Sequence, residues 1–369
     1  MLRSESAPKP CKQFSAYLLA FLVFEAQVGV GLPGFQRVIF REAEHDAWLC
    51  VILAGLLSHI TVWCMFQVLK RGSRKDLFGI QQEIFGRWVG GLATLLYTLY
   101  LSFGFLVILR NYVEMVQTWM FPDMPTWLLG SIIAYLAVYG VLGGVRVIVG
   151  ICTITFFLTI WLVIFIWFPL RYSLWSQLLP LLEADIGQLL RGTVKMSFTL
   201  VGFELIYVLF PYIRKPEQAP KYTHVGLIMS TLLYLIVMVV TLSYFSPNQL
   251  LQTVWATFTM FKIVMFPFLE RFEYVAISVW MLVILPNLAL YLWASTKGLK
   301  RIFGWKQKVS TLGIAVIAVV SSLFLDTRIQ IDQMNDLFSK ISFVAVFIYP
   351  WLILLGYGMM RLRRRGPSS

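Results

Sequence analysis

Long apolar runs restrict the fold of this chain more than any other feature of its sequence. A helix of roughly 20 apolar residues is long enough to cross the hydrocarbon core of a bilayer. With 59% hydrophobic residues, 13% charged residues and a mean hydropathy of +0.77, the sequence predicts an all-α membrane protein. The runs predict about ten transmembrane helices, at about 14–40, 47–69, 88–120, 126–145, 147–168, 190–212, 223–246, 272–296, 309–325 and 339–360.

The segment between the seventh and eighth runs is ambiguous. Residues 249–270 are apolar but include Lys262 and Pro267. We interpret them as an interfacial or re-entrant helix, and an eleventh span is the alternative. The expected organisation is a cytoplasmic N-terminal tail at 1–13, one polytopic transmembrane domain at 14–360 and a basic cytoplasmic tail at 361–369.

Positive charges favour one side of this topology. Lys and Arg concentrate near the N-terminus, in the loops at about 70–87, 214–221 and 297–308, and in the C-terminal RLRRR. Because cytoplasmic loops are enriched in these residues, both termini are predicted to be cytoplasmic. The net charge of +13 follows from this bias and from attraction to anionic membrane lipid, so it indicates no nucleic-acid partner.

Two glycine-centred irregularities interrupt predicted spans. The first is EAQVGVGLPGFQR, at 25–37, and the second is LVGFE, at 200–204. Five spans separate the two starting points, and an odd number of spans inverts the second set relative to the first. Two sets that each open with a broken helix are typical of an inverted-repeat transporter with a site near the bilayer midplane. The repeats are predicted at about 14–168 and 190–360.

A helix break at mid-depth exposes backbone groups that a ligand could use. Pro33 lacks an N–H, and the glycines around it tolerate unwound dihedral angles. Backbone groups freed in hydrocarbon are costly unless they line a cavity. Amides of the outer half-helix would suit a carboxylate, and free carbonyls of the inner half-helix would suit an ammonium or a cation, so a zwitterionic amino acid fits both. The alternative is a kink that permits close helix packing.

Glu25 and Glu204 are charged residues beside the two breaks. Charged residues inside spans are costly and usually have a partner or a task. Either carboxylate could hold a ligand ammonium or exchange a proton. The alternative for each is a structural pair with a buried base such as Lys195 or Arg110.

Other charged residues are better explained by structure. Arg110 and Glu114 lie four apart on one helix face and are predicted to pair with each other. Glu270, Arg271 and Glu273 are predicted to form an interfacial cluster of ion pairs at the outer start of the eighth span.

The cysteines and histidines have no ligand spacing, so the sequence predicts no metal site. The cysteines are expected to be small packing residues, and the histidines are expected to be isolated. No cofactor or enzymatic motif occurs. These residues are Cys11, Cys50, Cys64, Cys152, His45, His59 and His224.

Five motifs in order carry a resemblance to a known family. They are GVGLPG in the first span, FPDMPTW after the third, YGVLGGVRV before the fifth, VGFELIYVLFPYIRKPEQAPK in the sixth and FLERFEYVAISVW leading into the eighth. Together they resemble the endospore germination permease family over about residues 12–360. That family supplies the B subunit of nutrient germinant receptors and belongs to the amino acid–polyamine–organocation superfamily, which has the LeuT-like fold.

The resemblance implies a receptor subunit in the inner membrane of a bacterial spore. It would work beside an A subunit and a C-subunit lipoprotein, bind a small nutrient such as an amino acid, and trigger germination. Arg146 departs from the expected pattern before the fifth span, where GGVRV replaces a Gly-acidic pair. The residues expected to contact the ligand are Glu25, Gly29, Val30, Gly31, Leu32, Gly34, Val201, Gly202, Phe203, Glu204 and Tyr207.

A proton-coupled amino-acid transporter is the alternative function. The fifth span offers only Thr153, Thr155 and Thr159 as polar groups and no lysine for ion coupling, which favours a sensor. A proton site at Glu25 would favour the transporter instead. A structural membrane scaffold would leave both helix breaks unexplained.

Overall fold

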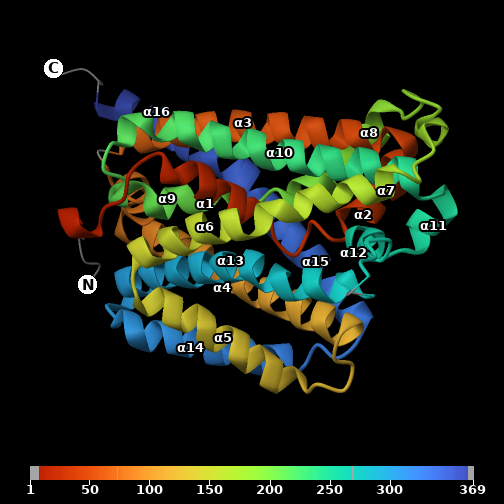
Figure 1. Cartoon of the computed structure of the whole chain (residues 1–369). Helices are drawn as coiled ribbons and strands as arrows, with labels where there is room; N and C mark the ends of the chain where they lie inside the picture. Colours follow the sequence, from red (N-terminus) through yellow and green to blue (C-terminus); the bar gives the residue numbers. More distant parts are fainter. Residues whose placement is uncertain (1–7, 73, 268–269, 365–369) are drawn as a thin grey trace.

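The computed structural model describes residues 8–72, 74–267 and 270–364, and these residues form a bundle of helices that run roughly parallel to one axis (Figure 1). The first half contains α1 Leu18–Gln27, α2 Phe35–Ala43, α3 Ala47–Arg71, α4 Leu77–Trp119, α5 Thr126–Leu142, α6 Val145–Thr159 and α7 Trp167–Leu170. The second half contains α8 Ile186–Thr199, α9 Ile206–Leu209, α10 Ala219–Tyr244, α11 Pro247–Gln252, α12 Ala256–Phe261, α13 Phe272–Phe303, α14 Gln307–Ser322, α15 Arg328–Ser342 and α16 Tyr349–Arg364.

Short irregular helices extend several of these elements. A 3-10 stretch at Ile160–Ile166 joins α6 to α7, and 3-10 turns flank α9. A π-helical stretch at Phe343–Ile348 joins α15 to α16. Among the described residues, six helices are long and apolar enough to cross a membrane, or seven if the pair Ile186–Thr199 and Phe203–Tyr212, bent by 54°, is one span. The predicted all-α membrane fold is confirmed, and the count of ten spans stays a prediction.

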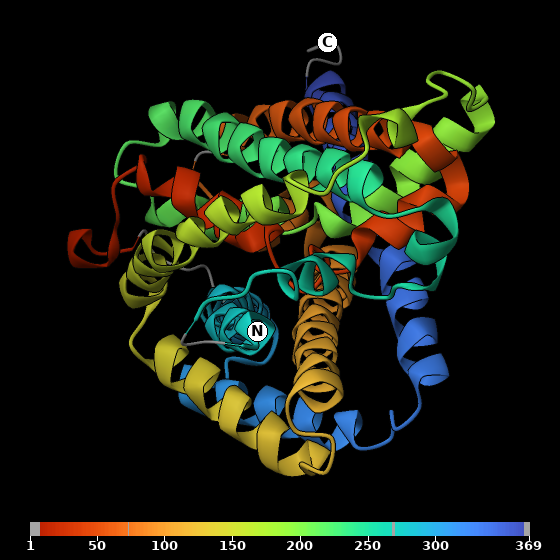
Figure 2. The ribbon, with the colours of Figure 1, turned by 45° about the vertical axis from the view of Figure 1, so that its right-hand side comes forward.

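Two pairs of helices form opposite edges of the bundle, and other helices pack between them. Helices α3 and α10 pack against each other at one edge, and α5 and α14 pack against each other at the opposite edge (Figures 1 and 2). Between them α4 packs against α13, and α1 packs against both α10 and α6. The two broken helices therefore lie inside the bundle, where neighbouring helices surround their irregular backbone.

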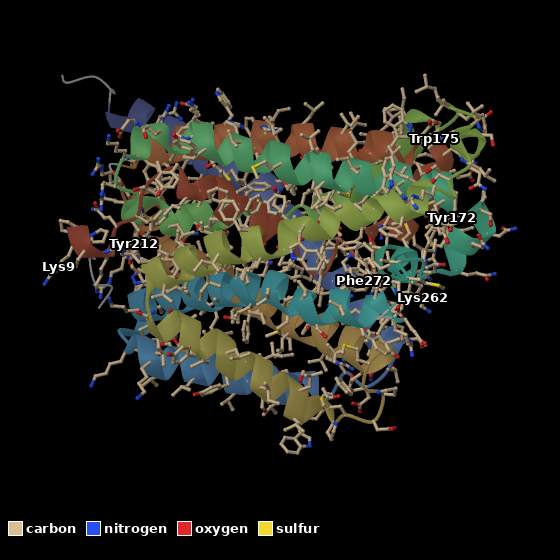
Figure 3. All side chains as sticks on the ribbon, in the orientation of Figure 1. Lys9, Tyr172, Trp175, Tyr212, Lys262 and Phe272 are labelled. Atoms are coloured by element: carbon tan, nitrogen blue, oxygen red, sulfur yellow. The ribbon has the colours of Figure 1, made fainter. Side chains whose placement is uncertain are left out.

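The two ends of the bundle differ in which segments they carry. Lys9 and Tyr212 lie at one end, whereas Tyr172, Trp175 and Lys262 lie at the other (Figure 3). The C-terminal end of α16 lies at the same end of the bundle as Lys9, so the described part of the chain begins and ends on one side (Figures 1 and 3). A chain that crosses a membrane an even number of times begins and ends on the same side of it.

Two helices extend well beyond the apolar runs. Helix α4 begins at Leu77 rather than near 88, because Asp76 caps it by accepting a hydrogen bond from Gly79 N at 2.8 Å. Its first turn is apolar and buried, the polar residues Gln81, Gln82 and Glu83 follow, and the chain bends at Gly86, whose φ is 76°. Helix α15 begins at Arg328, ahead of the run predicted at 339–360, because Thr327 caps it by accepting a hydrogen bond from Gln330 N at 3.3 Å. Its first turns are polar, so hydropathy alone does not detect them.

The segment at 249–270 contains no helix long enough to span a membrane among its described residues. Helices α11 and α12 have six residues each, and they lie at the end of the bundle opposite Lys9 (Figures 1 and 3). An eleventh span is therefore wrong for this part of the chain.

Candidate functional site

The two helix breaks lie against each other. Helix α1 ends at Gln27 and α2 begins at Phe35, while α8 ends at Thr199 and helical structure resumes at Phe203. Gly202 has φ 121°, and a Cβ there would overlap the Ala26 carbonyl oxygen. Glycine is therefore required at this position by both its dihedral angle and the close approach of the first break.

Side chains satisfy the carbonyls at the end of α1. Asn287 on α13 donates to Glu25 O at 2.7 Å and to Val28 O at 3.1 Å. Tyr234 on α10 donates to Gln27 O at 2.9 Å. The prediction that these carbonyls are free for a ligand ammonium is wrong, because neighbouring helices supply the donors.

The other side of the first break is held by the 249–270 segment. Thr257 on α12 donates its hydroxyl to Leu32 O at 3.1 Å and its amide to Pro33 O at 3.2 Å. The Gln36 side chain in turn donates to the Thr257 hydroxyl at 2.6 Å. These bonds fix the path of the chain as it enters α2.

Glu204 is fully buried and fully hydrogen-bonded. Its Oε1 accepts from the Tyr100 and Tyr291 hydroxyls, each at 2.8 Å, and its Oε2 accepts from Gly202 N at 2.6 Å. The carboxyl group therefore ties the second break to α4 and α13. The alternative that Lys195 or Arg110 pairs with it is wrong, since its partners are tyrosines.

Glu25 is also fully buried, but its environment is different. Neither carboxyl oxygen has a hydrogen-bond partner among the described residues. Thr155 on α6 is a polar neighbour of the carboxyl group, although its hydroxyl donates to Ile151 O at 2.8 Å. A buried carboxyl group without such partners is costly to charge, which sets Glu25 apart from Glu204.

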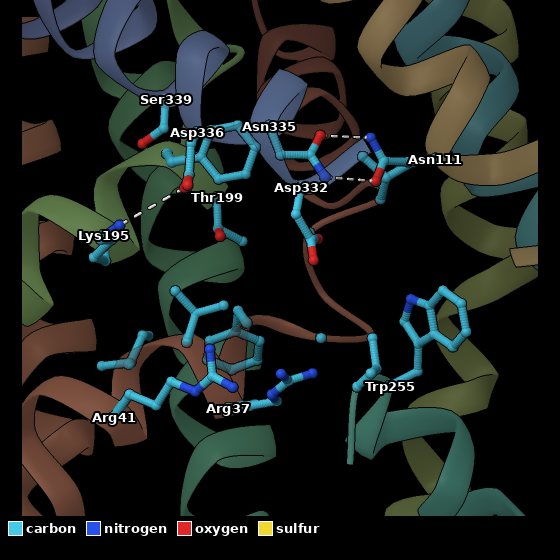
Figure 4. Close-up of a pocket in the computed structure, with 18 of the residues that line it drawn as sticks. Arg37, Arg41, Asn111, Lys195, Thr199, Trp255, Asp332, Asn335, Asp336 and Ser339 are labelled. Atoms are coloured by element: carbon cyan, nitrogen blue, oxygen red, sulfur yellow. Dashed lines mark hydrogen bonds and ion pairs between the residues drawn. The ribbon is translucent and has the colours of Figure 1, made fainter. Parts of the chain in front are cut away.

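A cavity of about 320 Å³ lies on one side of the two breaks (Figure 4). Three of the predicted ligand residues line it: Val30, Gly31 and Gly34. A Cβ at Gly31 would lie 2.7 Å from Thr199 Cγ2, so the first break and the end of α8 form adjoining parts of the wall. The walls are completed by α2, α4, α8, α15 and the chain at Val254 and Trp255.

The remaining predicted residues are buried outside the lining of this cavity. Phe203 packs edge-on against Phe347, with ring centroids 5.7 Å apart, and the Tyr207 hydroxyl is buried without a partner among the described residues. Gly29 lies beside Asn287. The residues in this group are Glu25, Gly29, Leu32, Val201, Gly202, Phe203, Glu204 and Tyr207.

Sequence reasoning missed most of the polar lining. On α15, four polar residues spaced i, i+3, i+4 and i+7 share one face, a pattern that could have identified them. Arg37 and Arg41 on α2 have the i, i+4 spacing of a shared face as well. The missed polar residues include Arg37, Arg41, Glu42, Asn111, Lys195, Thr199, Arg328, Asp332, Asn335, Asp336 and Ser339.

The pairing predicted between Arg110 and Glu114 is also wrong. Glu114 instead pairs with Arg328 at 2.7 Å, and Arg110 donates to Leu325 O at 2.6 Å. Both partners come from the chain around α15, which a helical spacing rule cannot anticipate. Of the interfacial cluster predicted for Glu270, Arg271 and Glu273, the pair between Arg271 and Glu273 is present, with Arg271 Nε 3.0 Å from Glu273 Oε1.

Two of the three histidines are not isolated. His59 on α3 and His224 on α10 stack with ring centroids 4.9 Å apart, and their Nδ1 atoms are 2.7 Å apart. The described residues contain no group of three His, Cys, Asp or Glu residues that could hold a metal ion. Of the cysteines, Cys11 is exposed and therefore not a packing residue, whereas Cys50, Cys64 and Cys152 are buried.

Comparison with known proteins identifies the family. A family model described as "Spore germination protein" matches residues 13–331. The chain belongs to the spore germination permease family. The chain is 34% identical to spore germination protein GerQB of Bacillus cereus over 353 residues, which cover 95% of this chain and 98% of that protein. It is 23% identical to spore germination protein A2 of Bacillus subtilis (strain 168), over 93% of this chain and 94% of that protein.

Solved structures confirm the fold of the permease. The amino-acid complex of MhsT with L-phenylalanine superposes with a TM-score of 0.58 at 15% identity, covering 93% of this chain and 88% of that chain. A manganese transporter of Eremococcus coleocola gives the same TM-score at 12% identity, covering 92% and 78%. These proteins have the LeuT fold, and the permease shares it, with its broken helices at α1–α2 and α8–α9.

Proposed function

We propose that this germination permease is the membrane subunit of a germinant receptor and binds a small nutrient, most simply an amino acid, beside its two helix breaks. The observation that carries the proposal is the cavity of about 320 Å³, whose wall contains Gly31, Gly34 and Thr199 from the two breaks. A volume near 300 Å³ is at the lower end for small-molecule sites, as suits a small ligand.

The wider setting is part of the same proposal. The receptor would lie in the inner membrane of the spore, with both termini cytoplasmic, and would assemble with an A subunit and a C-subunit lipoprotein. Support comes from the relatives named as spore germination proteins and from the basic loops that share an end with Lys9. The complex of MhsT with L-phenylalanine supports an amino acid as the ligand.

Direct binding tests the ligand site. Each of the twenty protein amino acids is titrated into the purified full-length permease by isothermal calorimetry. We expect at least one to bind, and we expect Gly31→Leu and Ser339→Phe to abolish that binding because both side chains would fill the cavity. Gly313→Leu is the matched control, since a Cβ at Gly313 meets no atom within 4 Å.

Two outcomes would contradict the proposed site. One is that none of the twenty amino acids binds the wild-type protein. The other is that a well-folded Ser339→Phe protein binds as tightly as the wild type, because Ser339 lies on α15 and its replacement leaves the break itself unchanged.

A proton-coupled transporter is the second candidate, favoured by the unpartnered carboxyl group of Glu25. Uptake of the bound amino acid into proteoliposomes, with and without an imposed pH gradient, separates the two functions. A transporter would show gradient-driven uptake that Glu25→Gln abolishes, because glutamine cannot release a proton. A receptor would bind the amino acid with no such uptake.

A further inference from the structure

The acidic residues that line the cavity already have basic partners. Arg191 Nε lies 3.2 Å from Glu42, and Lys195 Nζ lies 3.8 Å from Asp336. Arg328 bridges two acids, Asp332 at 2.9 Å and Glu114 at 2.7 Å. Most of the charge on the α15 side of the cavity is therefore balanced within the protein.

The two arginines of α2 differ from these paired charges. Arg37 and Arg41 form no ion pair in the part of the chain that the structure describes, and the Nε atom of Arg37 is buried without a hydrogen-bond partner. The positive charges of Arg41 and Arg328 repel the Arg37 guanidinium group, and the negative charge of Asp332 attracts it. Figure 4 shows both guanidinium groups on the opposite side of the cavity from the α15 side chains.

Two like charges spaced i, i+4 on one helix repel each other. Arg37 is partly buried, so less water screens its charge, whereas Arg41 is exposed. An anion between them would relieve the repulsion and supply the missing acceptors. A guanidinium group binds a carboxylate through two parallel hydrogen bonds, which makes arginine well suited to this role.

We infer that Arg37 and Arg41 bind the carboxylate of the nutrient, with its remaining groups directed across the cavity towards Asp332 and Ser339. The inference rests on the proposed nutrient site and assigns the ligand class as a small monocarboxylate, of which an α-amino acid is one. Asp332, the acid that would face the ammonium group of the ligand, is already paired with Arg328. The carboxylate of the ligand therefore contributes more to affinity than its ammonium group does.

A ligand-free measurement tests the charge of the site. Ser339→Cys in a Cys11→Ser background provides one accessible thiol in the cavity, since the other three cysteines are buried. Its rates of reaction with anionic sulfonatoethyl and cationic trimethylammonioethyl methanethiosulfonate are compared. We expect Arg37→Gln with Arg41→Gln to lower the anionic-to-cationic rate ratio by about ten-fold.

Two control variants sharpen this measurement. Arg37→Lys keeps the charge and should leave the ratio unchanged. Arg171→Gln removes a positive charge that does not line the cavity, and it should also have no effect. A ratio that is the same with and without the α2 arginines would overturn the inference.

Ligand analogues test the carboxylate contact itself. The amino acid that binds wild type most tightly is compared with its methyl ester, its decarboxylated amine and the acid that lacks the amino group. We expect the ester and the amine to bind at least about 100-fold more weakly, and the deaminated acid to lose less than about ten-fold. Arg37→Lys should weaken amino-acid binding even though the charge remains, because lysine cannot form the paired contact.

The result separates this inference from the proposed function. An ester that binds as tightly as the amino acid, or binding that Arg37→Gln leaves unchanged, would overturn the arginine contact while the nutrient site stands. If no amino acid binds, the proposed amino-acid ligand fails, and the thiol measurement still decides whether the α2 arginines form an anion site.

Discussion

At the scale of single residues, Glu25 and Glu204 have opposite environments although each is fully buried beside a helix break. Glu204 accepts three hydrogen bonds, from Tyr100, Tyr291 and Gly202 N, whereas Glu25 accepts none from the described residues. A fully bonded buried group fixes the geometry around it. The hydrogen bonds of Glu204 therefore favour a structural role at the second break, whereas the surroundings of Glu25 offer no comparable set of bonds.

Replacement of Tyr291 tests the structural role of Glu204. Tyr291→Phe removes one donor, and Glu204→Gln replaces one acceptor by an NH₂ group that faces another donor. We expect each change to destabilise the protein by about 1–3 kcal/mol, measured as a lower melting temperature in detergent. Tyr135→Phe is the control, because Tyr135 is 67% exposed on α5.

One outcome of these measurements would instead assign Glu204 a role in ligand binding. If Glu204→Gln melts like the wild type and reaches the membrane in normal amount, but germination no longer responds to nutrient, the carboxylate would act on the ligand. We expect the reverse, with loss of response following loss of protein.

At the scale of helices, the contact between the first break and α8 sets how closely the two repeats approach. Gly31 lies against Thr199, and Gly34 lies against the Val254 carbonyl oxygen, which a Cβ would approach to 2.7 Å. A neighbouring side chain can be shortened by mutation, whereas a backbone carbonyl cannot. Gly31 is therefore the position at which packing and ligand binding can be separated.

A compensating pair of substitutions makes that separation. Gly31→Ala should lower stability by roughly 1–3 kcal/mol through overpacking against Thr199 Cγ2, 2.7 Å from the new methyl group. Thr199→Ser removes that methyl group, so the double variant should recover most of the lost melting temperature. A double variant as unstable as Gly31→Ala alone would show that the clash lies elsewhere.

The sequence located both breaks because glycine and proline are local signals of an irregular backbone. It could not show what the breaks contact, since Asn287 and Tyr234 belong to helices more than 200 residues away in the chain. The same limit explains Glu114, whose partner Arg328 is 214 positions distant. The cavity was only partly anticipated, because its polar lining on α15 lies outside the hydropathy windows that identified the spans.

At the scale of the whole molecule, the orientation in the membrane can be tested. The α4–α5 loop carries Asp123, and the α13–α14 loop carries Trp305, which is 51% exposed. In a Cys11→Ser background, a membrane-impermeant maleimide should label Asp123→Cys in intact cells and Trp305→Cys only after permeabilisation. Labelling of Trp305→Cys in intact cells would reverse the orientation and put the cavity on the cytoplasmic side.

The segment that precedes α1 is joined to the chain that follows α9. Phe14 N donates to Tyr212 O and Arg214 N donates to Phe14 O, each at 2.9 Å, in a parallel bridge between Phe14 and Ile213. This bridge lies beside the start of α1, which leads to the first break, and beside the end of the helical stretch that follows the second break. We therefore expect a displacement of the N-terminal segment to shift both breaks together.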